Sequence, residues 1–385
     1  MRSFLVVVVV AVAALIVQAD ENDTTTAVRR YYRQYLMLRA QGKLNEAITI
    51  LKKIVELDPL IRGAWYEMAC CYSQLGKLKE ACEALKKAIK TGDMNFRMIE
   101  NEKRLEKLRQ TKQYKELMKR RAELAKEGIR AKVKFFRKIL GENYHCEVLD
   151  KERFALILGV PKKEYLKVKK RLKELCNGLR ELLFEHPPDS YITVIVVSSM
   201  EDWTRKLRQS PRSAGGYTPE DMVLAVRRIR ALFHEFTHAL HFADQDALNQ
   251  KHPAWICEGL ACLFEAFRKK KNRIVGVSNH RLGRLKEQIR GGSVISWRRL
   301  FGMGRSEFMR RARSAYAVAG FIMRYLQDKG LLSRWYKEYT QHYKEDPTGA
   351  KALEKVLGCG IEEAERGWRK WVLQQSEEPK FFPGD

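Results

Sequence analysis

After its first nineteen residues, the 385-residue sequence lacks any further long hydrophobic segment, and this absence excludes a membrane protein with several spans. The sequence also lacks the composition of a disordered chain, because 45% of its residues are hydrophobic and 31% are charged. A chain of this length can form about two or three domains that each bury a core of their own. We therefore expect a globular protein that needs no disulfide or metal staple in order to fold.

Acidic residues are scarce relative to basic ones. The 47 Asp and Glu residues stand against 74 Lys and Arg, which leaves a formal net charge of +27. This charge attracts acidic polymers without sequence discrimination, so an anionic envelope surface is one expected partner. The basic runs at 96–140 and 162–180 are interleaved with apolar residues at helical spacing and have no base-stacking platform. They indicate solvated helix faces, and we expect no specific nucleic-acid partner.

The eight cysteines are not clustered, which argues against a small disulfide-rich scaffold. Most of them resemble small buried hydrophobic residues. Cys82 belongs to a predicted helix next to the one that carries Cys70 and Cys71. The spacing is compatible with a bridge between these helices but does not establish one.

The first nineteen residues have the pattern of a secretory signal peptide. Arg2 supplies a positive charge, Phe4–Val17 is an apolar run of fourteen residues, and Val17-Gln18-Ala19 has the small-residue spacing of a cleavage site. Fourteen helical residues reach about 21 Å, short of a hydrocarbon core of roughly 30 Å, so a cleaved signal is favoured over a retained anchor. We therefore expect a secreted or periplasmic protein.

An internal repeat with a period of 34 residues follows. Gly42-Lys43-Leu44-Asn45-Glu46-Ala47 recurs as Gly76-Lys77-Leu78-Lys79-Glu80-Ala81, and each unit has the pattern of two amphipathic helices joined at a glycine. The pattern resembles the tetratricopeptide repeat in units 28–61 and 62–95, with a third, capping unit from Phe96 to about Lys126. This resemblance implies a helical array at 28–126 that binds a protein partner or a substrate.

Beyond residue 140 the pattern is mixed. The β-branched run 191–197 predicts a buried strand, and 144–149 and 222–226 are further strand candidates. Residues 211–216 predict a loop, with a tight turn at 214–217. The region 253–372 is expected to be helical throughout, and helices are predicted at 227–242, 256–268, 281–288, 314–328 and 361–373. This order predicts an α+β fold, in which a small mixed sheet precedes a helical subdomain.

The helix predicted at 227–242 carries His234-Glu235-Phe236-Thr237-His238. Residues four apart lie on one face of a helix, so both imidazoles can reach one zinc ion at about 2.0 to 2.1 Å. Glu235 points to the side, where it can take a proton from a metal-bound water. A catalytic zinc site needs a third protein ligand, and Glu258 begins a downstream helix with small residues at 259 and 261. Those small residues are expected to let this helix approach the first one closely.

The HExxH helix, Trp255 and the segment Glu258-Gly259-Leu260-Ala261 together resemble the gluzincin zinc peptidases. They resemble in particular the minimal peptidase-MA-like domains that accompany tetratricopeptide repeats in bacterial envelope proteins. The resemblance extends over about residues 132–373 and implies a zincin-like domain, with the sheet, the HExxH helix and a C-terminal helical subdomain.

The same resemblance implies a role for each site residue. His234, His238 and Glu258 would bind Zn²⁺, and Glu235 would be the general base. Tyr316 corresponds to a tyrosine on a later helix that is a candidate for stabilising the oxyanion, and an ordinary core tyrosine is the alternative for it.

Three nearby residues leave alternatives open. Asp244 lies six residues after His238, where metzincins place their third ligand, but that class needs a glycine at the position of His241. His241 lies on the face of the two histidine ligands, and it is expected at the helix surface or hydrogen-bonded behind the ligands, with direct binding of the metal as the alternative. Many gluzincins place an acid four residues after the third ligand, where this chain has Cys262. Glu265 or a backbone carbonyl could take that role, a thiolate could join the metal, or the site is weakened.

The sequence thus predicts a signal peptide at 1–19, helical repeats at 28–126, a gluzincin-like domain at 132–373 and a tail at 374–385. The predicted function is that of a zinc-dependent peptidase that hydrolyses peptide bonds outside the cytoplasm, with the repeats binding a partner or the substrate. The alternative is a catalytically inactive tetratricopeptide scaffold of the cell envelope.

Overall fold

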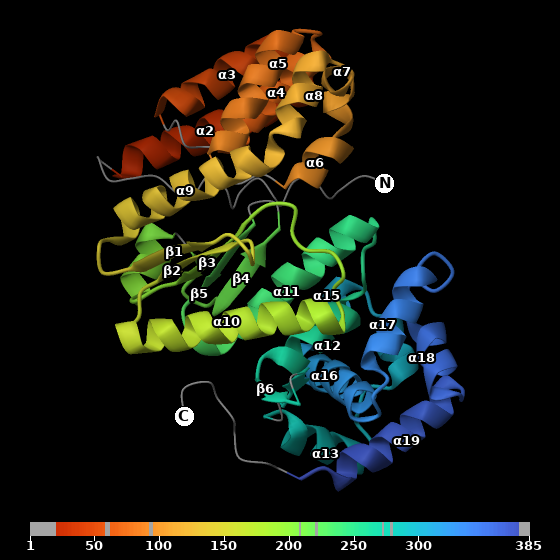
Figure 1. The fold of residues 1–385 in the computed structure, drawn as a ribbon. Helices are drawn as coiled ribbons and strands as arrows, with labels where there is room; N and C mark the ends of the chain where they lie inside the picture. The colour runs from red at the N-terminus through yellow and green to blue at the C-terminus, as the bar shows by residue number, and fades with distance from the viewer. Residues whose placement is uncertain are drawn as a thin grey trace. The chain divides into compact units, whose positions relative to one another are not determined.

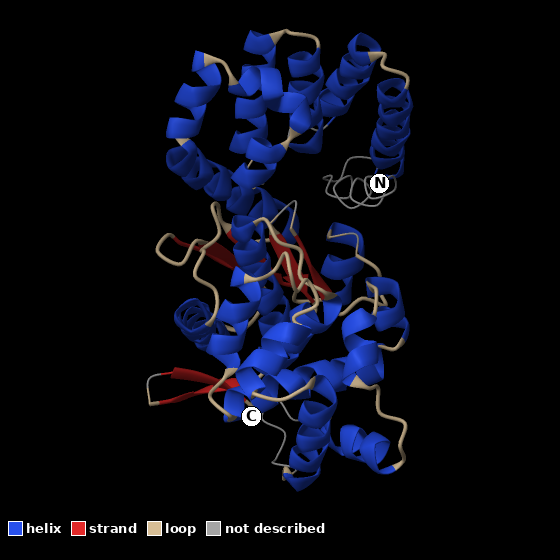
Figure 2. Cartoon of the chain, turned by 90° about the vertical axis from the view of Figure 1, so that its right-hand side faces the viewer, coloured by secondary structure: helices blue, strands red, loops and turns tan. Residues whose placement is uncertain are grey.

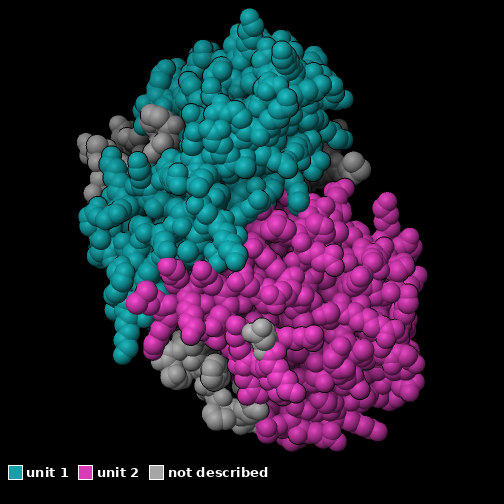
Figure 3. Space-filling model, in the orientation of Figure 1, with its two compact units in different colours: residues 1–165, 189–227 teal, residues 166–188, 228–385 magenta. Residues whose placement is uncertain are grey.

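The computed structural model describes residues 21–57, 62–91, 95–207, 209–219, 222–271, 273–277 and 280–376. The expected signal peptide at 1–19 and residues 377–385 of the expected tail lie outside the described residues. The chain forms two compact units, coloured separately in Figure 3: residues 1–165 with 189–227, and residues 166–188 with 228–385. Most of the chain is helical, and the sheets are small (Figure 1).

The first unit begins with two helix pairs that match the expected repeat. The pairs are α2 (Glu21–Ala40) with α3 (Leu44–Leu57), and α4 (Arg62–Gln74) with α5 (Leu78–Lys90). The two turns are alike. Gly42 and Gly76 have φ values of 73° and 74°, in the left-handed region that glycine adopts without steric cost. The amide N–H of Lys43 donates to the carbonyl of Leu38, and that of Lys77 to the carbonyl of Tyr72, both at 2.9 Å.

A buried ion-pair network joins the helices of this array. Glu67 on α4 is 8% exposed, and its carboxylate accepts a hydrogen bond from the hydroxyl of Tyr35 on α2. Its Oε2 atom lies 2.5 Å from Nη1 of Arg104 and 3.4 Å from Nη1 of Arg39. Because one carboxylate serves partners from two other parts of the chain, α2 and the turn at Arg104, its loss would leave two guanidinium groups without their shared counter-ion.

The third part of the array is less regular. It contains α6 (Phe96–Asn101), the 3₁₀ turn η1 (Lys103–Leu105), α7 (Glu106–Arg109), α8 (Lys112–Lys119) and α9 (Arg121–Leu140). Leu124 near the start of α9 belongs to the core of the repeats, and Phe136 near its end belongs to the core of the sheet. The domain boundary expected between 126 and 132 therefore falls inside one continuous helix, and the compact units divide the chain elsewhere.

A five-stranded sheet completes the first unit, with the strand order β1-β2-β3-β5-β4. The central pairs β2–β3 and β3–β5 are parallel, and the outer pairs β1–β2 and β4–β5 are antiparallel. The strands are β1 (His145–Leu149), β2 (Phe154–Leu158), β3 (Ile192–Val196), β4 (Gly215–Thr218) and β5 (Val223–Val226), and a short π-helical turn, η2 (Asp202–Lys206), follows β3. The three predicted strands are confirmed as β1, β3 and β5.

Two strands of this sheet differ from the sequence prediction. The loop and tight turn predicted at 211–217 are wrong in part, because β4 begins at Gly215, where a side chain would collide with Val226 of β5. The missing Cβ thus allows the edge strand to pair closely. The strand β2 was not expected, since its five residues are all apolar and such a short run does not show whether it is strand or helix.

The second unit is a helical body with one β-hairpin. It contains α10 (Lys162–Leu182) from residue 166 onward, α11 (Ile229–Leu248), α12 (Ala254–Phe264), β6 (Phe267–Lys270), β7 (Arg273–Gly276), α13 (Leu282–Arg290), α14 (Trp297–Gly302), α15 (Arg305–Arg310), α16 (Ala312–Asp328), α17 (Leu332–Gln341), α18 (Ala350–Leu357) and α19 (Ile361–Gln374). No helix in the described part of the chain combines the length and the apolar character needed to span a bilayer.

The hairpin β6–β7 overturns the expectation of an entirely helical region at 253–372, and Figure 2 shows it as a separate two-stranded ribbon. Its strands pair Lys270 with Arg273, and Lys271 between them has a left-handed φ of 47°, which suits a tight turn. Five of the seven residues at 267–273 are basic and exposed, so the segment has no apolar stripe for a helix to bury.

The close packing of α12 also differs from the prediction. A Cβ atom at Gly259 would lie 2.9 Å from the carbonyl oxygen of Ala319 on α16, and one at Gly320 of α16 would lie 3.0 Å from Cβ of Cys262. The small residue at 259 therefore allows α12 to approach α16, whereas it was expected to serve the contact with α11. All eight cysteines are free, so Cys82 forms no bridge with Cys70 or Cys71.

Candidate metal centre

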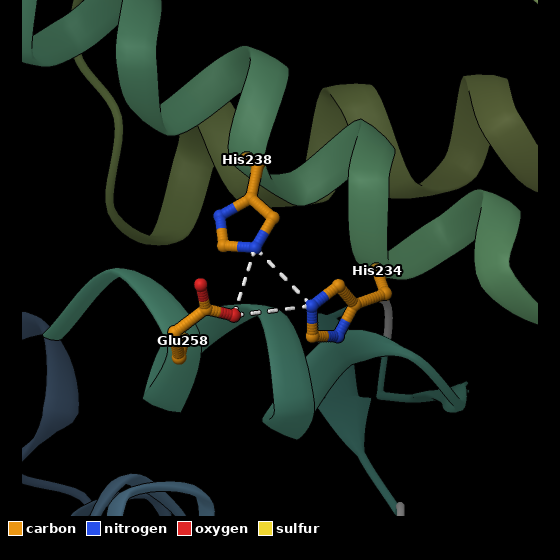
Figure 4. Close-up of side chains that lie close together, drawn as sticks. All are labelled: His234, His238 and Glu258. Atoms are coloured by element: carbon orange, nitrogen blue, oxygen red, sulfur yellow. Dashed lines mark hydrogen bonds and ion pairs between the residues drawn. The ribbon is translucent and has the colours of Figure 1, made fainter. Parts of the chain in front are cut away.

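Two helices of the second unit bring the predicted ligands together. His234 and His238 lie one turn apart on α11, and Glu258 lies in the first half of α12. The Nε2 atoms of the two histidines are 3.1 Å apart, and Oε2 of Glu258 lies 3.1 Å from Nε2 of His238 and 3.3 Å from Nε2 of His234. Figure 4 shows the two rings and the carboxylate directed at one point between them.

These spacings suit a single zinc ion. Ligand atoms at about 2.0 to 2.1 Å from zinc in tetrahedral geometry lie about 3.3 to 3.4 Å from one another. The three observed separations of 3.1, 3.1 and 3.3 Å are only slightly smaller. Two neutral imidazoles and one carboxylate are also a donor set that catalytic zinc sites use, with a fourth position left for water. The residues present therefore fit the ion.

The electrostatics of the group also favour a bound cation. Glu258 is 6% exposed; burial acts to raise its pKa, but hydrogen bonds with His234 and His238 outweigh burial and lower it. Burial acts to lower the pKa of His234, but hydrogen bonds with Cys262 and Glu258 raise it well above its usual value. The group thus retains a negative carboxylate that attracts positive charge: without a metal a proton on His234 balances it, and a zinc ion would take the place of that proton.

Glu265 lies behind His234, where the sequence left open which group would support this predicted ligand. Its Oε2 atom lies 3.6 Å from Nδ1 of His234, and its Oε1 atom lies 3.0 Å from Nδ1 of His280 and 2.5 Å from Nη1 of Arg281. At 3.6 Å the contact with His234 is an ion pair and not a hydrogen bond, and an acid on the Nδ1 side favours a ring whose Nε2 faces the ligand group. Nothing in the sequence near the motif marks His280 or Arg281, because the hairpin β6–β7 separates them from Glu265.

Cys262 belongs to this supporting group and not to the ligand set. Its sulfur lies near His234 and Glu265, whereas the set around Glu258 does not include it. Burial raises the pKa of the Cys262 thiol, which disfavours a thiolate ligand. The charge of Arg281 beside Glu265 also disfavours a second cation among these three residues.

Glu235 and Tyr316, the two residues predicted to be catalytic, lie beside the predicted ligands. Glu235 is half-buried on α11 and, among the described residues, makes no hydrogen bond or ion pair. The ring centroid of Tyr316 on α16 lies 6.2 Å from that of His234. Burial and the negative charge of Glu258 raise the pKa of Tyr316, so its hydroxyl keeps its proton at neutral pH, and in this structure it donates to Sδ of Met309 at 3.7 Å.

Asp244 and His241, the other candidates on α11, lie in a different cluster. Asp244 accepts hydrogen bonds from Nδ1 of His186 at 2.8 Å and from the hydroxyl of Tyr336 at 2.7 Å, and it is no part of the ligand group. The prediction of a surface or supporting position for His241 is wrong. His241 is 1% exposed, and its Nε2 atom lies 2.8 Å from Nδ1 of His252, so it serves the buried packing behind α11.

Comparison with known proteins supports the helical repeats. Residues 63–91 match the tetratricopeptide repeat family. The chain is also similar to a curated chloroplastic protein of Arabidopsis thaliana, with 32% identity over 90 residues, which are 23% of this chain and 27% of that protein. The chain therefore spans about a quarter of the length of that relative. A tetratricopeptide repeat is thus established at 63–91, and the assignment of the metal centre depends on its own residues and geometry.

Proposed function

We propose that this chain is a zinc-dependent peptidase of the gluzincin type. The observation that carries the proposal is the convergence of His234, His238 and Glu258, whose ligand atoms lie 3.1 to 3.3 Å apart. The carboxylate of Glu235, which has no partner among the described residues, supports hydrolysis over a purely structural site, because a structural site needs no base.

The proposed division of labour follows from the positions of the side chains. Zinc, when bound, acidifies a coordinated water and polarises the substrate carbonyl. Glu235 accepts the proton of the attacking water and passes it to the leaving amine. Tyr316 donates a hydrogen bond from its hydroxyl to the developing oxyanion and keeps its proton, and Glu265 holds the ring of His234 in its binding orientation.

The repeats have a separate role in this proposal. Tetratricopeptide repeats stack into surfaces that bind proteins, so the array around residues 63–91 would hold a protein partner or present the substrate. We also propose that the protein acts outside the cytoplasm, on the basis of the signal-like first nineteen residues. Fusion of residues 1–25 to a reporter enzyme, followed by fractionation, tests this point; a reporter retained in the cytoplasm would reject it.

The decisive experiment compares zinc content with hydrolysis. We expect the purified chain to hold one zinc ion, measured by plasma mass spectrometry, and to cleave members of a mixed peptide library. The variant Glu235→Gln should keep its zinc and lose about 10²- to 10⁴-fold in rate, because only the base is removed. His342→Ala, at an exposed histidine outside the centre, is the matched control and should change neither quantity.

The alternative is an inactive scaffold built on the same repeats, and the presence of Cys262 where many gluzincins have an acid favours it. Zinc bound by the wild type without hydrolysis of any library member would support the scaffold and reject the peptidase. Absence of zinc from the wild type would reject the metal centre itself.

A further inference from the structure

A long groove lies in the second unit, apart from the residues of the metal centre. It has a volume of about 580 Å³ and follows one face of α10, and the hairpin β6–β7 forms its other wall. The residues of α10 that line it recur at helical spacing from Leu166 to Glu181. The fifteen helical steps from Leu166 to Glu181 correspond to about 22 Å, which is the length of about six or seven extended residues.

Specific contacts hold the two walls together. The guanidinium carbon of Arg171 on α10 lies 3.8 Å from the ring centroid of Phe267 on β6, and Arg171 also donates to the carbonyl of Phe267. Further along α10, a Cβ atom at Gly178 would collide with Ile274 of β7. The groove is therefore a built feature, because an aromatic contact and a glycine fix the hairpin against the helix.

The charge of the groove is divided along its length. Lys169, Lys170 and Lys173 line the half nearer the start of α10. Glu174 and Glu181 line the other half, and Lys269 reaches the groove from the hairpin beside Ile274, which packs at Gly178. A ligand that runs along the groove thus meets three lysines of α10 at one end, where an anion is attracted most strongly.

The backbone of β6 favours an extended polypeptide as the ligand. The amide of Val277 donates to the carbonyl of Ala266, so alternation along the strand directs the backbone groups of Phe267 and Lys269 away from β7. Arg171 of α10 reaches the carbonyl of Phe267 on this same edge. The N–H and C=O of Lys269 therefore lie on the outer edge of β6, where an added strand can form main-chain hydrogen bonds.

We propose that this groove binds an acidic segment of an extended polypeptide, with its carboxylates at the lysine half and its backbone along Lys269. No aromatic residue lies among the described residues that line the groove, so they offer no stacking platform to single-stranded nucleic acid. Leu166 and Ile274 are the only large apolar residues among them, too few to bury a lipid chain. The inference is independent of the metal centre.

The test measures binding to the full chain by fluorescence anisotropy. The probe is a labelled twelve-residue peptide of alternating Glu and Ser. We compare it with a Gln–Ser peptide, a twelve-nucleotide single-stranded DNA and vesicles of phosphatidylglycerol in phosphatidylcholine. The groove variant is Lys169→Glu/Lys173→Glu/Lys269→Glu. The control is Lys344→Glu/Lys351→Glu/Lys370→Glu, which makes the same change in net charge at exposed lysines outside the groove.

We expect the groove variant to weaken binding of the acidic peptide by about tenfold or more and the control variant to weaken it less than about threefold. The corresponding Lys→Gln groove variant should be intermediate, and it guards against misfolding of the charge-reversed chain. Equal losses in both Glu variants, equal binding of the Gln–Ser peptide, or tighter groove-dependent binding of DNA or vesicles would each overturn the proposal. Glu235→Gln should bind the peptide as the wild type does, so failure of the peptidase proposal would leave this result unaffected.

Discussion

The helical repeats and the candidate metal centre are organised in opposite ways. In the repeats, the same turn occurs twice, with Gly42 and Gly76 at nearly the same φ and with equivalent hydrogen bonds one period apart. In the candidate metal centre, nothing is repeated: two residues of one helix meet a single carboxylate of another, and Glu265 at the end of that second helix faces one of them.

This difference determines how each region should respond to change. A repeat distributes its stability over equivalent contacts, so a single substitution weakens it by a limited amount. A centre that depends on three atoms at one point loses its property when any one of them is removed. The following experiments test whether the two regions respond in these different ways.

The largest effect is expected at the metal centre. Glu258→Gln removes the charge of the proposed carboxylate ligand, and we expect zinc affinity to fall by about 1,000-fold, since each ligand of such a site supplies a few kcal/mol of binding. Glu265→Gln should cost only about 10- to 100-fold, because it orients a ligand and binds no metal. Competition with a chromophoric chelator measures both, and Glu362→Gln, at an exposed residue of α19, is the control. Unchanged affinity in Glu258→Gln would show that the three atoms do not form a site.

An intermediate effect is expected at Glu67, where several side chains of the repeats meet at one carboxylate. Glu67→Ala leaves Arg104 and Arg39 without their shared carboxylate, and we expect a loss of about 3 kcal/mol in local stability. Hydrogen exchange of peptides from α2 and α4 measures this loss. Glu46→Ala, at an exposed position on α3, should stay within about 0.5 kcal/mol. Zinc affinity should not change in either variant, and a change would contradict the separation of the two regions.

The smallest effects are expected at two glycines that are present for different reasons. Gly76→Ala forces a side chain into a left-handed turn and should cost about 1 kcal/mol, and Gly76→Asn should be milder because asparagine tolerates that conformation. Gly259→Ala crowds the carbonyl of Ala319 and should cost about 1 to 2 kcal/mol, and Gly259→Asn should be worse. Amide hydrogen-exchange rates in α5 and α12 measure the loss of local stability at Gly76 and Gly259, respectively. If Ala and Asn ranked in the same order of stability at both positions, the data would contradict our explanation, in which backbone conformation limits Gly76 and lack of space limits Gly259.

Sequence reasoning succeeded where the information is local or periodic. The 34-residue period located both turn glycines, and helical spacing placed His234 and His238 on one face of α11. It failed where a feature depends on contacts between distant segments. The partners of Glu265 lie beyond a hairpin, and that hairpin was itself missed because its charged residues have no periodicity to detect.

The helix α9 has a mechanical consequence. It is a single rod of twenty residues, about 30 Å long, with Leu124 seated among the repeats and Phe136 seated against the strands. A stiff rod fixed at both ends passes on displacement instead of absorbing it. Any tilt that a captured protein imposes on the repeats would therefore reach the strands directly, and a glycine pair inserted at the middle of the rod would uncouple the two ends.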